Sequence, residues 1–134
     1  MQRQMCKAKL HGVTVTESNL NYVGSITIDR DLLEAADLIP YEWLHIVNVS
    51  TGDRFETYAI EGPRGSGVIG LNGATARRGL QGDKLIVMSY ALFSPAELAD
   101  FKPRLVFVDS HNHILRLDET EAAQETFHTR GSEG

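Results

Sequence analysis

The stretch LNYVGSITID, residues 19–28, sets strand-forming residues on both sides of a Gly-Ser pair at positions 24 and 25. The β-branched and aromatic residues that flank this pair predict a strand over residues 22–29. Glycine weakens the interior of a strand and marks either a bend or a place where another backbone segment comes close. Ser25 adds a nucleophilic hydroxyl there. The pair is therefore either a simple kink or a reactive peptide bond.

The rest of the sequence continues this pattern of short strands separated by turn residues. TGD at 51–53 is typical of a hairpin turn between two such strands. Alternating or β-branched runs predict strands at residues 12–17, 43–50, 54–60, 67–72, 84–92 and 103–110. Their spacing indicates one small β-barrel.

Two brief helical patterns connect the predicted strands. Asp29 is a suitable N-cap for a helix over residues 30–38. Ser94, followed by Pro95 at the first helical position, predicts a second helix over residues 94–100. From residue 117 onward the chain is polar and has no sustained apolar face, which predicts a disordered C-terminal tail over residues 117–134.

Composition limits the classes of function. The 134 residues are 42% hydrophobic, which suits one compact domain, and the net charge is -5 without a Lys/Arg stripe, which argues against nucleic acid as a partner. The sequence has neither a membrane-spanning apolar run nor a signal-peptide pattern, so we expect a cytoplasmic protein. The single cysteine, Cys6, has the pattern of a small buried hydrophobe rather than of a nucleophile.

The Gly24-Ser25 pair differs from the Gly-Ser pairs at 65–66 and 131–132, which lie in segments of loop composition. A hydroxyl directly after a glycine can attack the preceding carbonyl if the fold strains the peptide and stabilises the oxyanion. The product would be an ester and then a broken chain. The residues alone favour an intact kink, in a small barrel that binds a partner or serves a structural role.

Several segments in order resemble the bacterial aspartate 1-decarboxylases, a family of pyruvoyl-dependent enzymes. They are KLH (9–11), LNYVGSITID (19–28), GDRFETYAI (52–60), GSGVIGLNGATAR (65–77) and GD (82–83), and the resemblance covers about residues 1–114. It implies a six-stranded double-psi β-barrel with short connecting helices over residues 1–116. It also implies a homotetramer of αβ protomers with active sites at the subunit interfaces.

The resemblance implies that the chain is a zymogen that cleaves itself between Gly24 and Ser25. The Ser25 hydroxyl attacks the Gly24 carbonyl, the ester undergoes β-elimination to dehydroalanine, and hydrolysis leaves a pyruvoyl group with loss of ammonia. The products are a β chain of residues 1–24 and an α chain of residues 25–134. Thr57 and Asn72 match positions associated with this processing. In some lineages an activating protein takes part.

By the same resemblance, the pyruvoyl group made from Ser25 forms a Schiff base with the substrate amine and accepts the electrons released with CO2. L-Aspartate becomes β-alanine, which feeds pantothenate and coenzyme A synthesis. No metal and no external cofactor is implied. A second possibility keeps this carboxy-lyase chemistry with another amino acid, such as glutamate.

The resemblance also assigns the residues around the substrate. Lys9 and Arg54 bind its carboxylates, a task that suits Arg better than Lys when the contact is bidentate, and Tyr58 donates a proton to the decarboxylated product. From the residues alone, Lys9 and Arg54 are solvated positions on strands and Tyr58 is a packing residue. Adjacent residues of a strand point to opposite faces, so Thr57 and Tyr58 can share one site only where the strand is twisted or ends.

The segment NGATAR at 72–77 matches the part of the family that contacts the substrate, with Thr57 beside it. Backbone N–H groups after Asn72, in Gly73, Ala74 and Thr75, are suited to bind a carboxylate. The family segment has Ala where this chain has Thr75, which leaves fine specificity open. The residues alone indicate an ordinary Asn-Gly turn.

The histidines form no convincing metal site. His11, in the KLH segment, is expected to support the cleavage region. HNH at 111–113 lacks partners at zinc-ligand spacing and is typical of a surface turn.

Overall fold

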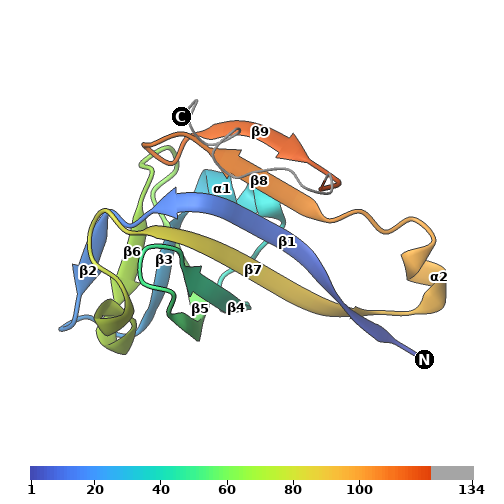
Figure 1. Cartoon of the computed structure of the whole chain (residues 1–134), viewed down its shortest axis with the longest axis horizontal. Helices are drawn as coiled ribbons and strands as arrows, with labels where there is room; N and C mark the ends of the chain where they lie inside the picture. The colour runs from blue at the N-terminus through green and yellow to red at the C-terminus, as the bar shows by residue number, and fades with distance from the viewer. Residues whose placement is uncertain (122–134) are drawn as a thin grey trace.

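The computed structural model describes residues 1–121 and has a mainly β fold with a few short helices (Figure 1). The strands are β1 (Arg3–Thr14), β2 (Glu17–Asn19), β3 (Ser25–Asp29), β4 (Trp43–Asn48), β5 (Arg54–Gly62), β6 (Ile69–Asn72), β7 (Lys84–Phe93), β8 (Arg104–Val108) and β9 (Ile114–Asp118). The helices are α1 (Arg30–Ala36), the 3-10 turn η1 (Gly73–Arg78) and α2 (Pro95–Leu98). None of the helices in the described residues is long and apolar enough to cross a membrane.

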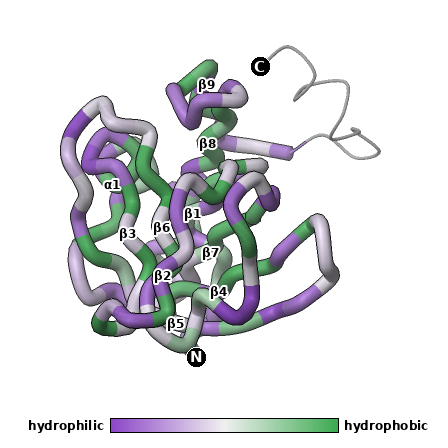
Figure 2. Tube along the Cα trace, turned by 90° about the vertical axis from the view of Figure 1, so that its left-hand side faces the viewer, coloured by the Kyte–Doolittle hydropathy of each residue, from purple (hydrophilic) through white to green (hydrophobic). Residues whose placement is uncertain are grey.

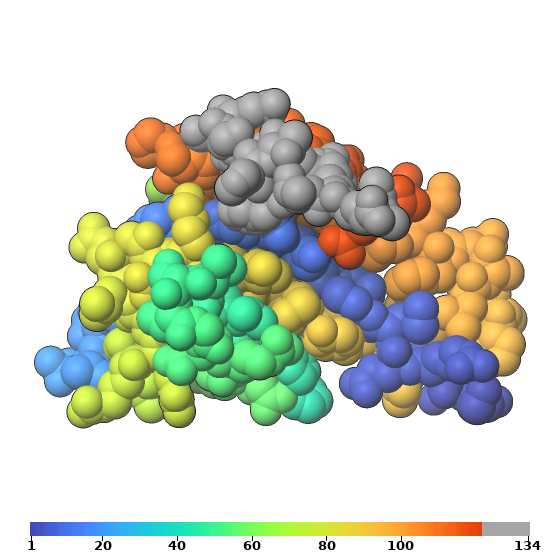
Figure 3. Space-filling view, in the orientation of Figure 1, coloured from blue at the N-terminus to red at the C-terminus, as the bar shows by residue number. Residues whose placement is uncertain are grey.

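The described strands form one sheet in the order β2-β6-β3-β5-β4-β7-β1-β8-β9. The long strands β1 and β7 run antiparallel across the molecule, and β8 lies parallel to β1 on its other side (Figure 1). In Figure 3, the first residues of β1 (blue) and the segment around α2 (orange) extend together to one side of the molecule.

The sheet closes on itself through the junction of β1 and β2. Only Val15 and Thr16 separate these strands, and Thr16 N donates to the Ile69 carbonyl of β6 at 2.8 Å. β1 pairs with β7 while its continuation β2 pairs with β6. If β1 and β2 are counted as one bent strand, a ring remains that consists of β1/β2, β6, β3, β5, β4 and β7. The mainly β class is confirmed, and the six-stranded double-psi description of this ring stays a prediction.

The core fills the inside of the ring with aliphatic side chains. Along β4, Leu44 and Ile46 are buried while the residues between and before them are partly or fully exposed, as strand alternation requires. Figure 2 shows apolar (green) and polar (purple) residues interspersed along the chain. The largest fully buried side chains of the core are Leu10, Val13, Val15, Ile26, Ile28, Leu32, Leu44, Ile46, Ile69, Leu71 and Leu85.

Both predicted helix starts are confirmed. The Asp29 carboxylate caps α1 by accepting from Asp31 N at 2.8 Å. Ser94 and Glu97 form a reciprocal capping box at α2, with Pro95 in the first turn. Each helix ends earlier than predicted, because Asp37 adopts a left-handed conformation with φ 56° after α1 and α2 is a single turn.

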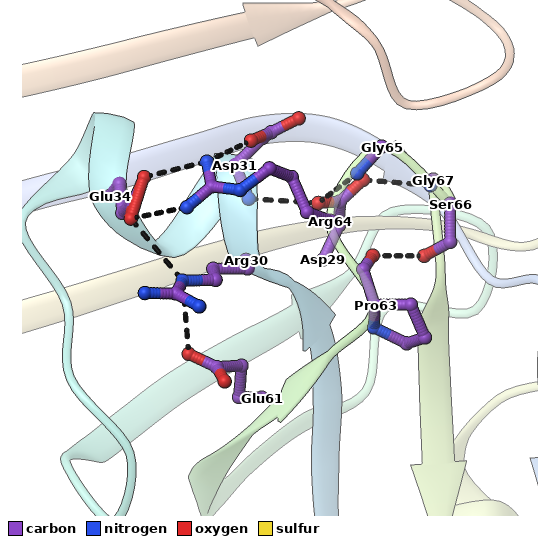
Figure 4. A network of polar contacts seen from close by, with 10 residues as sticks. All are labelled: Asp29, Arg30, Asp31, Glu34, Glu61, Pro63, Arg64, Gly65, Ser66 and Gly67. Atoms are coloured by element: carbon purple, nitrogen blue, oxygen red, sulfur yellow. Dashed lines mark hydrogen bonds and ion pairs between the residues drawn. The ribbon is translucent and has the colours of Figure 1, made fainter.

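Asp29 also fixes the loop that leads into β6. This buried carboxylate accepts from Gly65 N at 3.1 Å and Gly67 N at 2.8 Å (Figure 4). Arg64 in the same loop spans Asp31 and Glu34 of α1 with contacts of 2.6–2.8 Å. Breaking the hydrogen bonds of a buried carboxylate costs free energy. The Asp29 bonds therefore hold the end of β3 close to the loop that leads into β6.

Several strand boundaries differ from the predictions. The strand predicted over residues 12–17 is the end of the long β1, Arg3–Thr14, and the start of β2. The strand expected over residues 22–29 starts only at Ser25, so the Gly-Ser pair lies at a junction between a loop and a strand rather than inside a strand. β9 continues to Asp118, two residues past the predicted domain end at 116. Residues 122–134 of the predicted tail lie outside the described part of the chain.

Candidate active site

Ser25 is a buried, strained residue at the start of β3. Its exposed fraction is 1%, and its φ of 101° lies in a region that non-glycine residues rarely adopt. Gly24, by contrast, has no positive φ, and a Cβ there would meet nothing within 4 Å. The backbone strain therefore falls on the serine itself and not on the glycine before it.

Asn72, the last residue of β6, holds the hydroxyl of Ser25. The two residues are paired in the antiparallel β3–β6 ladder. Asn72 Nδ2 donates to Ser25 Oγ at 3.3 Å and to Thr27 Oγ1 at 2.8 Å. Ser25 and Thr27 are two residues apart and so share one face of the strand. The amide therefore fixes the Ser25 side chain within a small polar cluster that is almost fully buried.

Gly73 lies directly against the other side of the Gly24-Ser25 bond. It adopts φ 63°, and a Cβ at this position would lie 2.9 Å from Gly24 Cα and 3.0 Å from Tyr22 O. Only glycine fits both the angle and the space. The close backbone approach expected at the Gly-Ser pair is thus made possible by Gly73 rather than by Gly24.

The turn η1 covers Ser25 and brings Thr75 to its carbonyl. Thr75 Oγ1 lies 3.2 Å from Ser25 O and 2.8 Å from Asn72 O. Ala74, the preceding residue of the turn, is exposed. The predicted processing residues Gly24, Ser25 and Asn72 and the predicted substrate residues Gly73 and Thr75 therefore form one cluster.

The strand β5 presents Arg54 and Tyr58 on its outer face and Thr57 on its inner face. Thr57 is paired with the buried Leu44, whereas Tyr58 is paired with the exposed Trp43. This confirms that Thr57 and Tyr58 point to opposite faces. The Tyr58 ring stacks on the Tyr41 ring with centroids 5.6 Å apart and 13° between the planes, which restrains its orientation.

Tyr58 is also the closest of the β5 candidates to Ser25 in the sheet. The parallel pairing of β3 with β5 matches Ile26 with Ala59. Ser25 directly precedes Ile26, and Tyr58 directly precedes Ala59. Ser25 and Tyr58 therefore lie side by side on neighbouring strands. A phenol at this position can reach groups attached to residue 25, provided that the Tyr58 ring turns toward β3.

Lys9 lies on β1 and is already paired with a carboxylate. Its Nζ is 2.7 Å from Glu121 Oε2, and its side chain is only 16% exposed. His11 lies two residues further along β1, so it shares the face of Lys9. Burial, together with the positive charge of Lys9, lowers the pKa of His11 to about 4. The cations Lys9 and Arg116 both act on the His11 ring and disfavour its protonated form.

Arg54 on β5 lies on a different part of the barrel wall from Lys9 and His11 on β1. Successive pairings connect Arg54 to Val47, Val47 to Ile86 and Ile86 to His11. Three strand spacings separate Arg54 from His11, or about 14 Å between backbones. Arg54 lines a hollow of about 220 Å³ with His45, Ile46, Phe55 and Glu56. Within one chain, His11 and its neighbour Lys9 on β1 are therefore separated from Arg54 on β5.

Sequence reasoning missed three residues of this site. Thr27 could have been found from strand periodicity, because it lies two residues after Ser25 on the same face. Tyr41, which stacks on Tyr58, and Glu121, which pairs with Lys9, carry no local signal in the sequence.

Cys6, predicted to be a small buried hydrophobe, is only half-buried, and desolvation raises the pKa of its thiol.

The remaining histidines do not add a metal centre to the part of the chain that is described. His111 and His113 are exposed in the turn between β8 and β9, as predicted for a surface turn. No group of three His, Cys, Asp or Glu residues among residues 1–121 is arranged to hold a metal ion.

The fold and this cluster define a small β-barrel protein with a strained serine under a polar turn. The profile of the aspartate decarboxylase family matches residues 1–115. The aspartate 1-decarboxylase of Carboxydothermus hydrogenoformans is 52% identical over 91% of this chain and 96% of its own length. Those of Shouchella clausii and Chromobacterium violaceum are 54% and 53% identical over 92% and 94% of this chain, and over 97% and 98% of their own lengths.

The chain belongs to the aspartate decarboxylase family. The predicted enzyme class, a carboxy-lyase, is thereby confirmed.

Proposed function

We propose that the chain cleaves its own backbone between Gly24 and Ser25, converts Ser25 into a pyruvoyl group and decarboxylates L-aspartate to β-alanine and CO2. The observation that carries this proposal is the buried Ser25, held at φ 101° with the Asn72 amide on its hydroxyl. Family membership supports the reaction, and the geometry supports the place of cleavage.

Backbone strain favours cleavage at this bond. A residue held in a sparsely populated backbone conformation costs roughly 1–3 kcal/mol, and breaking the chain at its amide releases that constraint. Because Ser25 Oγ accepts from Asn72 Nδ2, its own hydrogen points elsewhere and a lone pair is held in a fixed direction. Gly73 supports the Gly24 backbone from the other side. The three residues together restrict the motion of the reacting groups.

The surroundings of Ser25 suit a small pyruvoyl group. Ser25 supplies the carbon skeleton, its burial excludes water, and the side chains of Asn72 and Thr75 place donors around residue 25. When it is formed, the group supplies a carbonyl that accepts electrons from a bound amino acid. Burial also protects it from side reactions with solvent.

The outer-face residues are suited to the substrate. L-Aspartate has two carboxylates, and we assign Lys9 and Arg54 to bind them, with Tyr58 as the proton donor. We assign Gly73, Ala74 and Thr75 to the same site, and Thr57 to its inner side, because Thr57 points to the opposite face of β5 from Tyr58. Each hydrogen bond between these cations and a carboxylate contributes about 1.5–3 kcal/mol. That gain compensates for the weak repulsion expected from a net charge of -5.

A second copy of the chain would bring the separated groups together. Lys9 and His11 lie on a different part of the barrel wall from Arg54 in one chain. Large apolar side chains are also exposed around Tyr58, including Tyr41 at 78% and Trp43 at 58%. Exposed apolar patches of this kind mark interaction surfaces. We therefore propose a homotetramer of αβ protomers, with each site completed by a neighbouring subunit.

We propose that the decarboxylase domain, predicted to end at residue 116, extends to the end of β9 at Asp118. The whole chain is cleaved into residues 1–24 and 25–134. The product β-alanine would feed pantothenate and coenzyme A synthesis in the cytoplasm. If purified protein is cleaved only after cell extract is added, an activating protein is needed.

Release of CO2 by purified, fully cleaved protein tests this proposal. L-Aspartate and L-glutamate are supplied side by side to the wild type, Ser25→Ala and Ser66→Ala. Ser66 follows Gly65 in an exposed loop and so is a matched Gly-Ser control. We expect CO2 from aspartate with the wild type and Ser66→Ala and none with Ser25→Ala. Preference for glutamate, or no release by the cleaved wild type, would refute the proposed substrate.

A further inference from the structure

The Thr75 hydroxyl lies between two carbonyl oxygens. Its Oγ1 is 2.8 Å from Asn72 O and 3.2 Å from Ser25 O, and one hydroxyl hydrogen must serve both. The bond to Asn72 is the local contact that a threonine commonly makes to the preceding turn. The contact to Ser25 is different, because it links the turn to the residue that undergoes covalent change.

The Ser25 carbonyl becomes charged during maturation, which makes this contact chemically relevant. After the chain shifts from the amide to the ester on Ser25 Oγ, β-elimination removes the proton from Ser25 Cα. The proton passes to water or hydroxide, and the electron pair moves onto the adjacent carbonyl oxygen. The pair then returns to form the Cα–Cβ double bond, the Cβ–Oγ bond breaks, and the Gly24 carboxylate leaves with Oγ. Ser25 O therefore carries negative charge at the height of this step.

We propose that Thr75 is a catalytic residue of this elimination, donating its hydroxyl hydrogen to Ser25 O as the negative charge develops. The inference rests on the proposed self-cleavage and assigns Thr75 a role beyond binding substrate. A hydrogen bond to a charged oxygen is about twice as strong as one to a neutral oxygen. The hydrogen shared with Asn72 O is thus drawn to Ser25 O when the proton leaves Cα.

The surrounding structure holds Thr75 ready for this task. Ser18 Oγ donates to Ala76 O at 3.1 Å and to Gly79 O at 3.0 Å, and Asn48 Nδ2 donates to Arg78 O at 2.9 Å. These bonds anchor η1 on the side that follows Thr75. Only rotation of a hydroxyl is then needed, which keeps the reorganisation cost low.

Asn72 complements Thr75 on the other side of the same residue. Its amide donates to Ser25 Oγ, the oxygen that departs with Gly24 during elimination. One donor therefore faces the oxygen that gains charge first and another faces the leaving oxygen. Low exposure of Ser25 and Asn72, 1% and 4%, strengthens both interactions.

The carbonyl of residue 25 is retained after Ser25 is converted, so Thr75 keeps its partner in the mature enzyme. Electron density is drawn toward this carbonyl whenever the amino acid loses CO2. Loss of the hydroxyl should therefore lower kcat and leave KM nearly unchanged, because the contact is made to the chain and not to the substrate.

The test compares Thr75→Val, which keeps the shape without the hydroxyl, with Thr75→Ser, which keeps the hydroxyl. Full-length proteins are followed by denaturing mass spectrometry with and without mild hydroxylamine, which cleaves esters. The ester form yields residues 1–24 as a hydroxamate and a 25–134 chain that still begins with serine. Thermal unfolding checks that the variants fold.

We expect Thr75→Val to form the ester and then to eliminate about 10- to 100-fold more slowly, so that the ester accumulates. Thr75→Ser should mature near the wild-type rate. Elimination at the wild-type rate in Thr75→Val, a block at the intact amide, or failure of Thr75→Ser to rescue would each overturn the role of Thr75. A wild-type chain that never breaks would instead overturn the proposed function, and this inference with it.

Discussion

Gly73 packs so closely against Gly24 that a single methyl group on Gly73 would lie 2.9 Å from Gly24 Cα. Gly24 directly precedes β3, and Gly73 directly follows β6. Their contact fixes the backbone just before the strained Ser25. The cleavage point is therefore shaped by a residue distant in sequence.

Substitution of Gly73 by Ala should slow chain cleavage strongly. Alanine at φ 63° costs about 1–2 kcal/mol and also collides with the Gly24 backbone. Gly52→Ala is the matched control, since Gly52 has φ 82° but open space around its Cα. The fraction of cleaved chain over time measures the effect. Equal cleavage in both variants would mean that the Gly73 contact does not shape the site.

Substitution of Glu121 by Gln should lower KM for L-aspartate about two- to five-fold. Glu121 holds Lys9 at 2.7 Å, so a substrate carboxylate that binds Lys9 must displace it. Partly exposed ion pairs contribute about 0.2–1 kcal/mol, which sets this range. Glu119→Gln makes the same change in net charge and should leave KM unchanged. If both variants shift KM alike, net charge rather than the Lys9 pair is responsible.

The half-buried His11 should make the protein less stable as the pH falls from about 6.5 to 4. Burial and the charge of Lys9 lower the pKa of His11 to about 4 in the folded state, whereas the unfolded chain protonates near 6.5. Between these values the unfolded state binds more protons, so the free energy of unfolding decreases as the pH is lowered. Denaturant unfolding of the wild type and His11→Gln across this range measures the effect. The variant should lose less stability, and parallel curves would contradict the assignment.

Tyr58→Phe should lower kcat about 100-fold or more without affecting chain cleavage. The change removes only the phenol hydroxyl that is assigned to proton transfer and keeps the ring stacked on Tyr41. Tyr41→Ala keeps the hydroxyl but removes the stack, so a smaller loss of kcat is expected. Turnover of fully cleaved enzyme measures both. Full kcat in Tyr58→Phe would exclude Tyr58 as the proton donor.

The local elements of the fold could be predicted because their signals lie in neighbouring residues. Asp29 and Ser94 were identified as helix caps from their side chains and the residues after them, and both form the expected bonds. Strand alternation also predicted that Thr57 and Tyr58 would face opposite sides. Such features need no information about distant contacts.

The strain at Ser25 could not be predicted, because it depends on tertiary contacts. The flanking residues favour a strand through Gly24, yet β3 begins only at Ser25. Gly73 and Asn72, brought by β6, impose the observed conformation on the Gly-Ser pair. Likewise, the pairing of Lys9 with Glu121 joins opposite ends of the described chain and has no signature in either segment.

The measurement that tests the central claim most directly is denaturing mass spectrometry of freshly purified protein beside Ser25→Ala and Ser66→Ala. For the wild type and Ser66→Ala we predict a fragment ending at Gly24 and a second fragment that starts at residue 25 and is one ammonia lighter than a serine-started chain. Ser25→Ala should remain intact. A wild-type chain that stays whole after long incubation, with and without cell extract to supply an activating protein, would contradict the account.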